Sequence, residues 1–467
     1  MNSLSDNPPF AIDLDLIRRL DRNGPRYTSY PTADRFVEAF SPAAYRSWAK
    51  KRDIIGGIRR SLSIYVHLPF CSTICFYCAC NKIVTRDKTK GEKYLEYLAK
   101  EIALQAPLFS DDPLVEQMHW GGGTPTFFNS SQLRGLFDLL RQNFKFAPDG
   151  EYSIEIDPRT VDPESIRDLR AMGFNRLSLG VQDFDTDVQR AVNRLQSEEQ
   201  TLAIMDTARQ TGFLSVNVDL IYGLPKQNLI TFNRTLARVI AAQPDRIAVY
   251  NYAHMPARFK PQRHIVDADL PSPDTKLKLL ALAAQRLTEA GYVYIGMDHF
   301  AKADDALTVA QQQGRLQRNF QGYSTHADCD LVSLGVSAIG SIGPTYSQNH
   351  RGIEEYYDSL DRGELPVTRG LELTADDLLR RAVIQTLMCH FSLSKQAIEL
   401  SYLIDFDRYF ATELAELRGL AKEGLLEFDE DWINVTPVGR MLIRNICMVF
   451  DKYLRHESEV GRYSRVI

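Results

Sequence analysis

Six β-rich runs alternate with segments of helical periodicity between residues 62 and 251, and this alternation is the strongest constraint on the fold of the chain. Strands that alternate with helices form parallel βαβ units. A spacing of about 30 residues per unit is typical of a (β/α) barrel, but a doubly wound open sheet has the same rhythm. Periodicity alone does not separate the two. The runs are residues 63–68, 115–120, 152–157, 176–181, 215–222 and 246–251.

The chain divides into three regions, according to where the strand–helix alternation begins and where it ends. Residues 1–61 form an N-terminal arm with a turn-rich segment at 24–33, and residues 62–365 hold the barrel with an extension. Residues 366–467 change to helices with a hairpin-like run at 425–436, which indicates a mainly helical, winged-helix-like domain. The expected fold class is α/β, a partial (β/α)6 TIM-like barrel between these two additions. A winged helix can bind DNA, but no basic recognition helix is obvious, so a covering or interaction role is expected.

Composition excludes several classes of protein. A net charge of −5 and 25% charged residues are ordinary for a globular chain, so we expect no nucleic-acid partner and no anionic membrane surface. The N-terminal segment lacks the apolar core of a secretory signal, and no run approaches the roughly 18 apolar residues of a membrane span. The odd count of seven cysteines favours reduced thiols. We therefore expect a cytoplasmic protein, and a monomer because no coiled coil or apolar stripe requires assembly.

Four of the seven cysteines lie within ten residues, directly after the first strand, with the spacing C-x3-C-x2-C-x-C. In a barrel this loop lies at the C-terminal end of the strands, where active sites are found. A structural zinc site usually uses two separated C-x2-C pairs, whereas three close cysteines suit an iron–sulfur cubane with one open iron. Zinc, or thiols without a metal, remain the alternatives. The fourth cysteine is either another ligand or faces away, and Cys329, Cys389 and Cys447 are expected to pack in the core.

Two further features lie at strand ends. The glycine run in HWGGGTPT (119–126) allows the backbone to approach a ligand closely, although a plain tight turn has the same composition. It is not a P-loop, because no Gly-Lys-Ser/Thr follows. Glu155 ends the third strand among apolar neighbours, so its carboxylate needs a cationic or hydrogen-bonding partner, either in a structural ion pair or in a ligand site.

C-x3-C-x2-C after the first strand of a six-stranded barrel is similar to the signature of the radical S-adenosylmethionine (SAM) superfamily. The chain also contains the segments GPRYTSYPTA, YVHLPFC, CACNKIVTR, HWGGGTPT, IEIDPR, GVQDF, DLIYGLPKQ, GMDHF, NFQGY and RNICMVFDKYL. Through these segments the whole chain resembles one family of radical SAM enzymes, the oxygen-independent coproporphyrinogen III oxidases.

The resemblance implies a set of site residues. Cys71, Cys75 and Cys78 would hold a [4Fe–4S] cluster, with SAM on the open iron, and Cys80 would be an additional cysteine that is not needed as a ligand. The residues implied for this first SAM are Tyr65, Gly122, Glu155 and Ile339. Those implied for a second SAM molecule are Tyr77, Gly123, Thr124, Gln182, Arg194, Asp219 and Ala253. The arm with Arg26, Tyr27 and Tyr30 would reach the active site.

The implied reaction is the conversion of two propionates of coproporphyrinogen III to vinyl groups, giving protoporphyrinogen IX without oxygen. A 5′-deoxyadenosyl radical would remove a hydrogen from the propionate β-carbon, and loss of CO2 and one electron would follow. An electron donor outside the chain is implied. The alternative is a related haem chaperone that binds and transfers haem. As the family is known, such relatives lack the GPRYTSYPT arm and the fourth cysteine of the loop, and this chain has both, which favours the enzyme.

Overall fold

The computed structural model describes residues 13–52, 60–109, 113–326 and 329–455. Within these residues, six parallel strands form the centre of a twelve-stranded sheet, and they lie side by side in the order in which they occur in the sequence. A doubly wound sheet reverses its strand order, so this order confirms the predicted barrel class. The six strands are β1 (Leu62–Leu68), β4 (Leu114–Gly122), β5 (Lys145–Ile156), β6 (Arg176–Gln182), β7 (Ser215–Tyr222) and β8 (Arg246–Asn251).

Further strands extend both sides of this centre and leave the barrel open. β13 (Asp330–Leu334) pairs in parallel with β1, and β14 (Ile339–Ile342), β15 (Thr345–Asn349) and β16 (Val367–Glu372) continue antiparallel. On the other side β10 (His299–Ala301) and β9 (Val293–Gly296) follow β8. The strands β13 to β15 were not predicted. Every residue of β13 and β15 is buried, so neither strand has the polar–apolar alternation by which a half-exposed strand is recognised.

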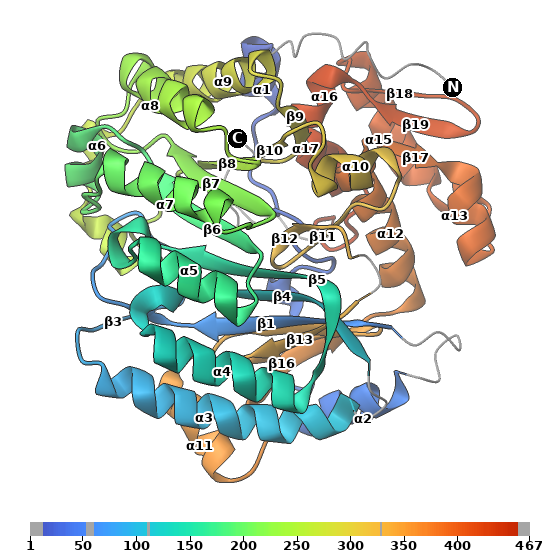
Figure 1. Ribbon diagram of the computed structural model, residues 1–467. Coiled ribbons are helices and arrows are strands. Elements are labelled where there is room, and N and C mark those ends of the chain that lie inside the picture. Colours follow the sequence, from blue (N-terminus) through green and yellow to red (C-terminus); the bar gives the residue numbers. More distant parts are fainter. Residues whose placement is uncertain (1–12, 53–59, 110–112, 327–328, 456–467) are drawn as a thin grey trace.

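Helices cover the outer face of the parallel strands, in succession from α3 to α9 (Figure 1). Local signals set their ends: α5 begins with a capping box on Asp162 and with Pro163, and it ends at Gly173, whose φ of 121° suits glycine. The helices are α3 (Thr89–Gln105), α4 (Ser130–Asn143), α5 (Pro163–Met172), α6 (Thr186–Ala191), α7 (Glu198–Gln210), α8 (Leu229–Ala242) and α9 (Pro273–Glu289).

Side chains alternate along the parallel strands between the helix-covered face and the barrel interior. In β1, Ile64 and Val66 are fully buried in the hydrophobic core, whereas Tyr65 and His67 line a cavity on the inner side. The inner positions of the neighbouring strands are also polar, for example Glu155 in β5 and Asp219 in β7. Because a strand has a period of two, the same segments therefore supply both an apolar core and a polar interior.

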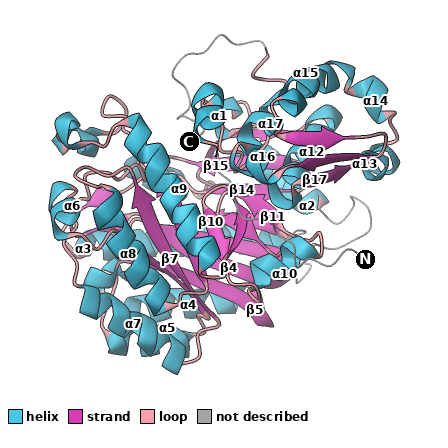
Figure 2. Cartoon of the chain, turned by 90° about the horizontal axis from the view of Figure 1, so that it is seen from above, coloured by secondary structure: helices cyan, strands magenta, loops and turns pink. Residues whose placement is uncertain are grey.

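The C-terminal domain contains a three-stranded sheet of β17 (Ser392–Ser394), β19 (Trp432–Val435) and β18 (Leu426–Phe428), as the predicted hairpin requires. Figure 2 shows its helices grouped on one side of the chain, away from α4, α5, α7 and α8. β16 lies beyond the expected boundary of 366 and hydrogen-bonds to β15; the boundary itself stays a prediction. The domain's helices are α12 (Ala375–His390), α13 (Lys395–Tyr402), α14 (Phe406–Tyr409), α15 (Ala411–Lys422), α16 (Pro437–Met441) and α17 (Ile443–Val449).

The N-terminal arm ties the barrel to the C-terminal domain. Arg18 of α1 (Leu14–Leu20) pairs with Asp274 of α9, and the neighbouring Arg19 pairs with Glu423.

The other short elements are α2 (Pro42–Lys51), α10 (Ala306–Gln312), α11 (Ile353–Asp361), β2 (Phe70–Cys71), β3 (Ile83–Val84), β11 (Gln317–Asn319), β12 (Gly322–Ser324) and the 3-10 helices Ala33–Arg35, Ala106–Phe109, Pro125–Phe127, Pro158–Thr160, Lys260–His264 and Asp267–Asp269.

Two of the three scattered cysteines pack as expected, and one does not. Cys389 and Cys447 are fully buried among apolar side chains. Cys329 is half-buried, and its Sγ lies 3.8 Å from a carboxylate oxygen of Glu116. A thiol beside a carboxylate is not in a hydrophobic core, so the packing role predicted for Cys329 is wrong.

A buried glutamate on α3 holds the turn that follows β13. Glu101 accepts hydrogen bonds from the backbone N–H of Gly335 at 2.7 Å, from Asn349 at 2.7 Å and from the Tyr356 hydroxyl at 2.6 Å. Glu101→Leu leaves these buried donors without an acceptor, so we expect the free energy of unfolding to fall by at least about 3 kcal/mol. Glu96→Leu, at an exposed position of the same helix, is the control, with an expected change within about 0.5 kcal/mol. Urea unfolding of the two variants measures the difference, and equal midpoints would contradict the prediction.

Candidate active site

The cysteine loop lies at the C-terminal end of β1, as predicted. β2 and β3 pair at its base. Two contacts hold its far side against the segment after α6: the Phe76 N–H donates to the Val192 carbonyl at 3.0 Å, and the Asn193 amide donates to the Ile74 carbonyl at 2.7 Å. The loop thereby encloses a cavity of about 270 Å³, which Cys71, Cys75, Cys78 and Cys80 all line.

Cationic and hydroxyl groups surround the three cysteines of the predicted ligand set. The hydroxyl of Thr124 lies 3.4 Å from the Cys71 Sγ, and Arg194 and Arg159 donate to the Cys75 Sγ at 3.5 and 3.6 Å. Both arginines also pair with the buried Asp157, at 2.9 and 2.6 Å. Nearby positive charge favours the thiolate, which is the form that binds a metal. The donors therefore suit a thiolate-held cluster.

The sulfurs do not share one electrostatic environment. Burial raises the pKa of Cys71 to about 11. The hydrogen bond from Cys80 lowers the pKa of Cys78 to about 6, and the pKa of Cys80 is raised in return. Cys80 thus supports its neighbour as a donor, and it also lines the adjoining cavity described below.

The glycine run of β4 lies beside the end of β1, where Gly121 pairs with His67 and Gly122 with Leu68. Gly122 has a φ of 114°, and a Cβ there would lie 2.5 Å from the His67 ring. A Cβ on Gly123 would lie 2.6 Å from the carbonyl of Pro69, while the Gly123 N–H donates to the Leu68 carbonyl at 2.9 Å. Glycine is therefore required at Gly122 by its φ and by the His67 ring, and at Gly123 by the close approach of two backbones. The glycine turn therefore lines the cavity of the cysteine loop and does more than connect β4 to the next helix.

A second, larger cavity of about 480 Å³ adjoins the first, and Gly122 and Glu155 line both. All four residues implied for the first SAM line this larger cavity: Tyr65, Gly122, Glu155 and Ile339. Of the residues implied for a second SAM, those that line the cavity of the cysteine loop are Tyr77, Gly123, Thr124, Gln182, Arg194 and Asp219. Ala253 is not among the residues that line this cavity. It is linked to the lining residue Tyr77 through Gln262, whose side chain donates to the carbonyls of Ala253 and Tyr77 at 3.2 and 3.1 Å.

Glu155, on the inner side of the barrel, has the hydrogen-bonding partners that a carboxylate there requires. Its Oε1 lies 3.3 Å from His119 Nε2, and its Oε2 accepts from the Gly122 N–H at 3.2 Å. Burial alone would raise the pKa of Glu155, but His119 and the Gly122 N–H outweigh burial and lower it. Ser153 lies 2.6 Å from the other nitrogen of His119. Glu155 therefore presents a carboxylate oriented between the two cavities.

Other titratable groups of the interior are shifted by burial. Burial raises the pKa of Asp219 to about 6, although its carboxylate accepts from Asn217 at 2.9 Å and Ser178 at 3.1 Å. Burial lowers the pKa of His67, whose ring bridges the Tyr65 hydroxyl and the Asn81 carbonyl, at 3.1 and 3.0 Å. His67 is therefore a neutral hydrogen-bonding group at neutral pH.

Only one of the three arm residues named from the sequence faces the barrel interior. Arg26 pairs with Asp298 and lies 6.0 Å above the ring of Tyr250, which lines the cavity of the cysteine loop. Tyr27 and Tyr30 are buried: the Tyr27 hydroxyl donates to Asp451 at 3.0 Å, and Tyr30 accepts from the backbone of Lys452 at 3.3 Å. These two tyrosines attach the arm to the C-terminal segment.

Sequence reasoning assigned no role to Asp157 and Arg159, although both lie in the quoted IEIDPR motif. They follow Glu155 at the C-terminal end of β5, which is the position where the side chains of a barrel site converge. Their position was therefore a usable signal. The pairing of Asp157 with Arg194, which is 37 residues away, required the structure.

A barrel of parallel strands with a three-cysteine loop at its C-terminal end defines the radical SAM class. The family described as Radical SAM superfamily matches residues 65–239, and the HemN C-terminal domain family matches residues 373–442. Two relatives named oxygen-independent coproporphyrinogen III oxidase are similar over nearly their whole length. The one from Pseudomonas aeruginosa is 52% identical and that from Escherichia coli 51%; in each case 97% of this chain and 98% of the relative are covered.

The solved structure of coproporphyrinogen III oxidase (HemN) from Escherichia coli, described as a radical SAM enzyme, superposes with a TM-score of 0.91 at 50% identity. The match covers 96% of this chain and all of that one. The chain therefore belongs to the family of oxygen-independent coproporphyrinogen III oxidases. Membership implies a [4Fe–4S] cluster and SAM. In the part of the chain that the structure describes, no helix is both long and apolar enough to cross a membrane.

Proposed function

We propose that the chain converts coproporphyrinogen III to protoporphyrinogen IX without oxygen, by oxidative decarboxylation of two propionates. The observation that carries this proposal is the three-cysteine loop beside two adjoining cavities, in a chain half identical to enzymes of that name over nearly its full length. When bound, the cluster and SAM supply the 5′-deoxyadenosyl radical that removes a hydrogen from the propionate β-carbon.

Cys71, Cys75 and Cys78 are the proposed cluster ligands. Their sulfurs line one cavity, and the arginines on Cys75 add the positive charge that a thiolate requires. Asp157 holds these arginines in place as a positioning residue. Cys80 is proposed to be dispensable as a ligand, in agreement with its exposed position at the end of the loop.

Two SAM positions are proposed, one in the larger cavity and one in the cavity of the cysteine loop. Tyr65, Gly122, Glu155 and Ile339 hold the SAM that meets the cluster, where the Glu155 carboxylate can accept from a cationic amino or ribose hydroxyl group. The second is held by Tyr77, Gly123, Thr124, Gln182, Arg194, Asp219 and Ala253, in which Arg194 supplies a buried positive charge suited to a carboxylate.

The N-terminal arm and the C-terminal domain are proposed to cover the open side of the barrel. Arg26 above Tyr250 brings a cation to the barrel interior, and Tyr27 and Tyr30 fasten the arm to the C-terminal segment. A covered site excludes water and oxygen from a radical. The positive charge of Arg26 would also attract the carboxylates of the substrate.

The cellular setting is proposed on the same grounds. The cysteine loop must stay reduced to bind iron, which favours the cytoplasm. All proposed ligand and SAM residues come from one chain, which supports action as a monomer. Each radical step needs one electron from a donor outside the chain, and the electron lost with CO2 passes to an acceptor that is also outside the chain.

An anaerobic turnover assay tests the proposal. The cluster-loaded chain is incubated with coproporphyrinogen III, SAM and a reductant, and we expect two CO2 per porphyrinogen together with protoporphyrinogen IX. If the chain releases no CO2 but takes up haem and passes it to an acceptor protein, the haem chaperone alternative replaces the enzyme.

Glu155→Gln tests the first SAM position separately from turnover. The amide keeps the shape but loses the charge, so we expect SAM affinity to fall at least about tenfold, since a charge-assisted hydrogen bond contributes about 1.5–3 kcal/mol. Iron content is expected to stay unchanged. Equilibrium dialysis with labelled SAM measures the change, and the exposed Glu164→Gln on α5 is the matched control. Unchanged affinity in Glu155→Gln would remove Glu155 from the site.

A further inference from the structure

A second group of metal-ligating side chains lies at the opposite end of the barrel strands from the cysteine loop. Glu116 is near the start of β4, whereas Gly122, at the end of the same strand, lines the active-site cavities. Since a strand rises about 3.3 Å per residue, the two positions are about 20 Å apart. His326 and Cys329 lie just before β13. The group is therefore separate from the proposed cluster and SAM sites.

The three side chains bring one oxygen, one nitrogen and one sulfur together. Glu116 Oε2 lies 3.3 Å from His326 Nδ1 and 3.8 Å from Cys329 Sγ, and the three donor atoms all lie within 4.8 Å of one another. In a tetrahedral zinc site with bonds of about 2.0–2.3 Å, donor atoms are about 3.3–3.8 Å apart. The two measured separations fall within that range, so a metal ion fits between the donors with little movement.

A β-bulge in β4 orients the side chain of Glu116 towards His326 and Cys329. β1 pairs Leu62 with Val115 and Ser63 with Gln117, so Glu116 is an extra residue in the ladder. A bulge of this kind redirects a side chain. The hydroxyl of Ser61 donates to Glu116 Oε1 at 2.7 Å, which leaves Oε2 for His326 and Cys329.

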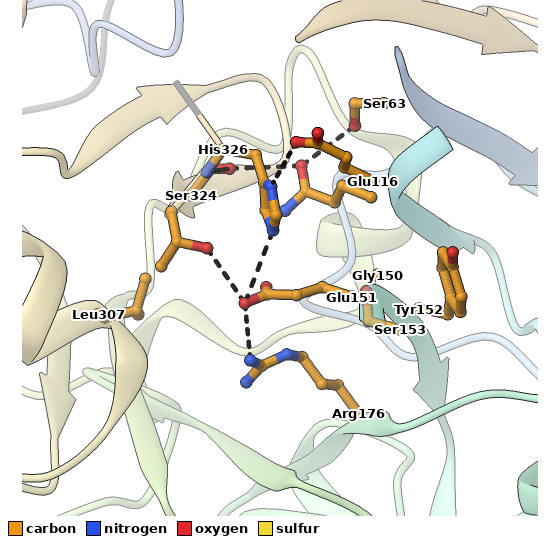
Figure 3. Close-up of polar contacts among 12 residues, drawn as sticks. Ser63, Glu116, Gly150, Glu151, Tyr152, Ser153, Arg176, Leu307, Ser324 and His326 are labelled. Atoms are coloured by element: carbon orange, nitrogen blue, oxygen red, sulfur yellow. Dashed lines mark hydrogen bonds and ion pairs between the residues drawn. The ribbon is translucent and has the colours of Figure 1, made fainter. Parts of the chain in front are cut away.

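A second carboxylate orients the histidine. Figure 3 shows His326 between Glu116 and Glu151, with Arg176 on the other side of Glu151. His326 Nε2 lies 3.8 Å from Glu151, while Arg176 and Thr325 donate to the same carboxylate at 2.7 and 3.1 Å. A metal-bound histidine usually directs its other ring N–H at a carboxylate or carbonyl. Nδ1 would bind the ion, and Nε2–H would face Glu151.

We propose that Glu116, His326 and Cys329 form a site for a divalent transition metal, with Zn²⁺ as the occupant. The mixed oxygen, nitrogen and sulfur donors suit zinc better than magnesium or calcium, which prefer oxygen ligands. The glutamate and a thiolate neutralise the charge of the ion, and a water completes the tetrahedron. The ion joins β4 to the segment before β13, which are the two neighbours of β1, and so fastens the N-terminal end of the barrel.

Metal analysis of the cluster-loaded holoenzyme tests the proposal. After anaerobic dialysis against micromolar Zn²⁺, we expect about one zinc per chain besides the iron, with X-ray absorption showing one sulfur at about 2.3 Å and lighter ligands at about 2.0–2.1 Å. His326→Gln and Cys329→Ser should each lower the retained zinc at least about tenfold at unchanged iron content. His254→Gln is the control, because His254 also pairs with a carboxylate, Asp267 at 3.0 Å, but is not part of the three-donor group.

Three results would overturn the proposal. Zinc with three sulfur neighbours places the ion in the cysteine loop instead. Zinc retained by both variants shows that these residues are not ligands. Absence of zinc from the wild-type holoenzyme shows that His326 only pairs with the two carboxylates and that the group holds no metal. The X-ray absorption spectrum of zinc in the wild-type protein distinguishes this site from the cysteine loop even if the variants fail to fold. A rise in the thermal midpoint on adding Zn²⁺, present in wild type and absent in Cys329→Ser, supports the structural role.

Discussion

Cys71→Ser will produce a chain that folds but contains no intact cluster and has no activity. A serine hydroxyl is a far weaker donor for iron than a thiolate, and a cubane held at three corners has no spare protein ligand. The Cys71 Sγ lies 3.4 Å from the Thr124 hydroxyl at the edge of the cavity, so the change leaves the surrounding hydrophobic core intact. Iron and sulfide content, the brown thiolate-to-iron absorption and SAM cleavage on reduction are the measurements.

Cys80→Ser is the matched control, since it is the same substitution two residues beyond Cys78 in the same loop. We expect iron and sulfide to stay at the wild-type level. Loss of the cluster in Cys80→Ser, or its retention in Cys71→Ser, would contradict the proposed ligand set. The pair of variants therefore separates the three ligands from the fourth cysteine.

Gly123→Ala will reduce turnover by at least about a hundredfold. A methyl group there would lie 2.6 Å from the backbone carbonyl of Pro69 and 2.8 Å from that of Phe70, and a backbone cannot give way as a side chain can. The strand end must move, which breaks the hydrogen bond from the Gly123 N–H to the Leu68 carbonyl and displaces the cysteine loop. A misplacement of about 1 Å can lower the rate about a hundredfold.

Gly135→Ala, in the exposed middle of α4, is the control for this substitution. A Cβ at Gly135 meets nothing within 4 Å, and alanine favours a helix over glycine by about 1 kcal/mol. We expect unchanged turnover and a slightly higher thermal midpoint. Single-turnover SAM cleavage and product formation are measured on both variants, with iron content recorded. Normal turnover in Gly123→Ala would show that the strand end tolerates the shift.

Features that depend on local sequence were predicted well. The six parallel strands, α12 and the hairpin of the C-terminal domain follow from periodicity and turn residues. The cysteine spacing indicated a cluster, and the glycine run indicated a close backbone approach. Each of these signals lies within a few residues, where chain geometry determines which side chains share a face.

Features that depend on long-range pairing were not predicted. β13 and β15 have no alternation because both of their faces are buried, and the partners of Asp157 and Glu116 come from distant segments. Cys329 was expected to pack in the core, although His326 lies only three residues before it. The proximity of both residues to Glu116 depends on the bulge in β4 and on the parallel pairing of β13 with β1.

The sequence by itself determined the class of chemistry, because cysteine spacing and strand–helix alternation are local properties of the chain. Only the tertiary structure decided that Arg159 and Arg194 meet at Cys75. It also decided that Tyr27 and Tyr30 attach the arm to the C-terminal segment, and that Glu116 meets His326 and Cys329 at the N-terminal end of the barrel strands. These contacts join residues far apart in the sequence. They form only when the strands pair in one register, and a shift of one residue would turn the side chains of a strand to its other face.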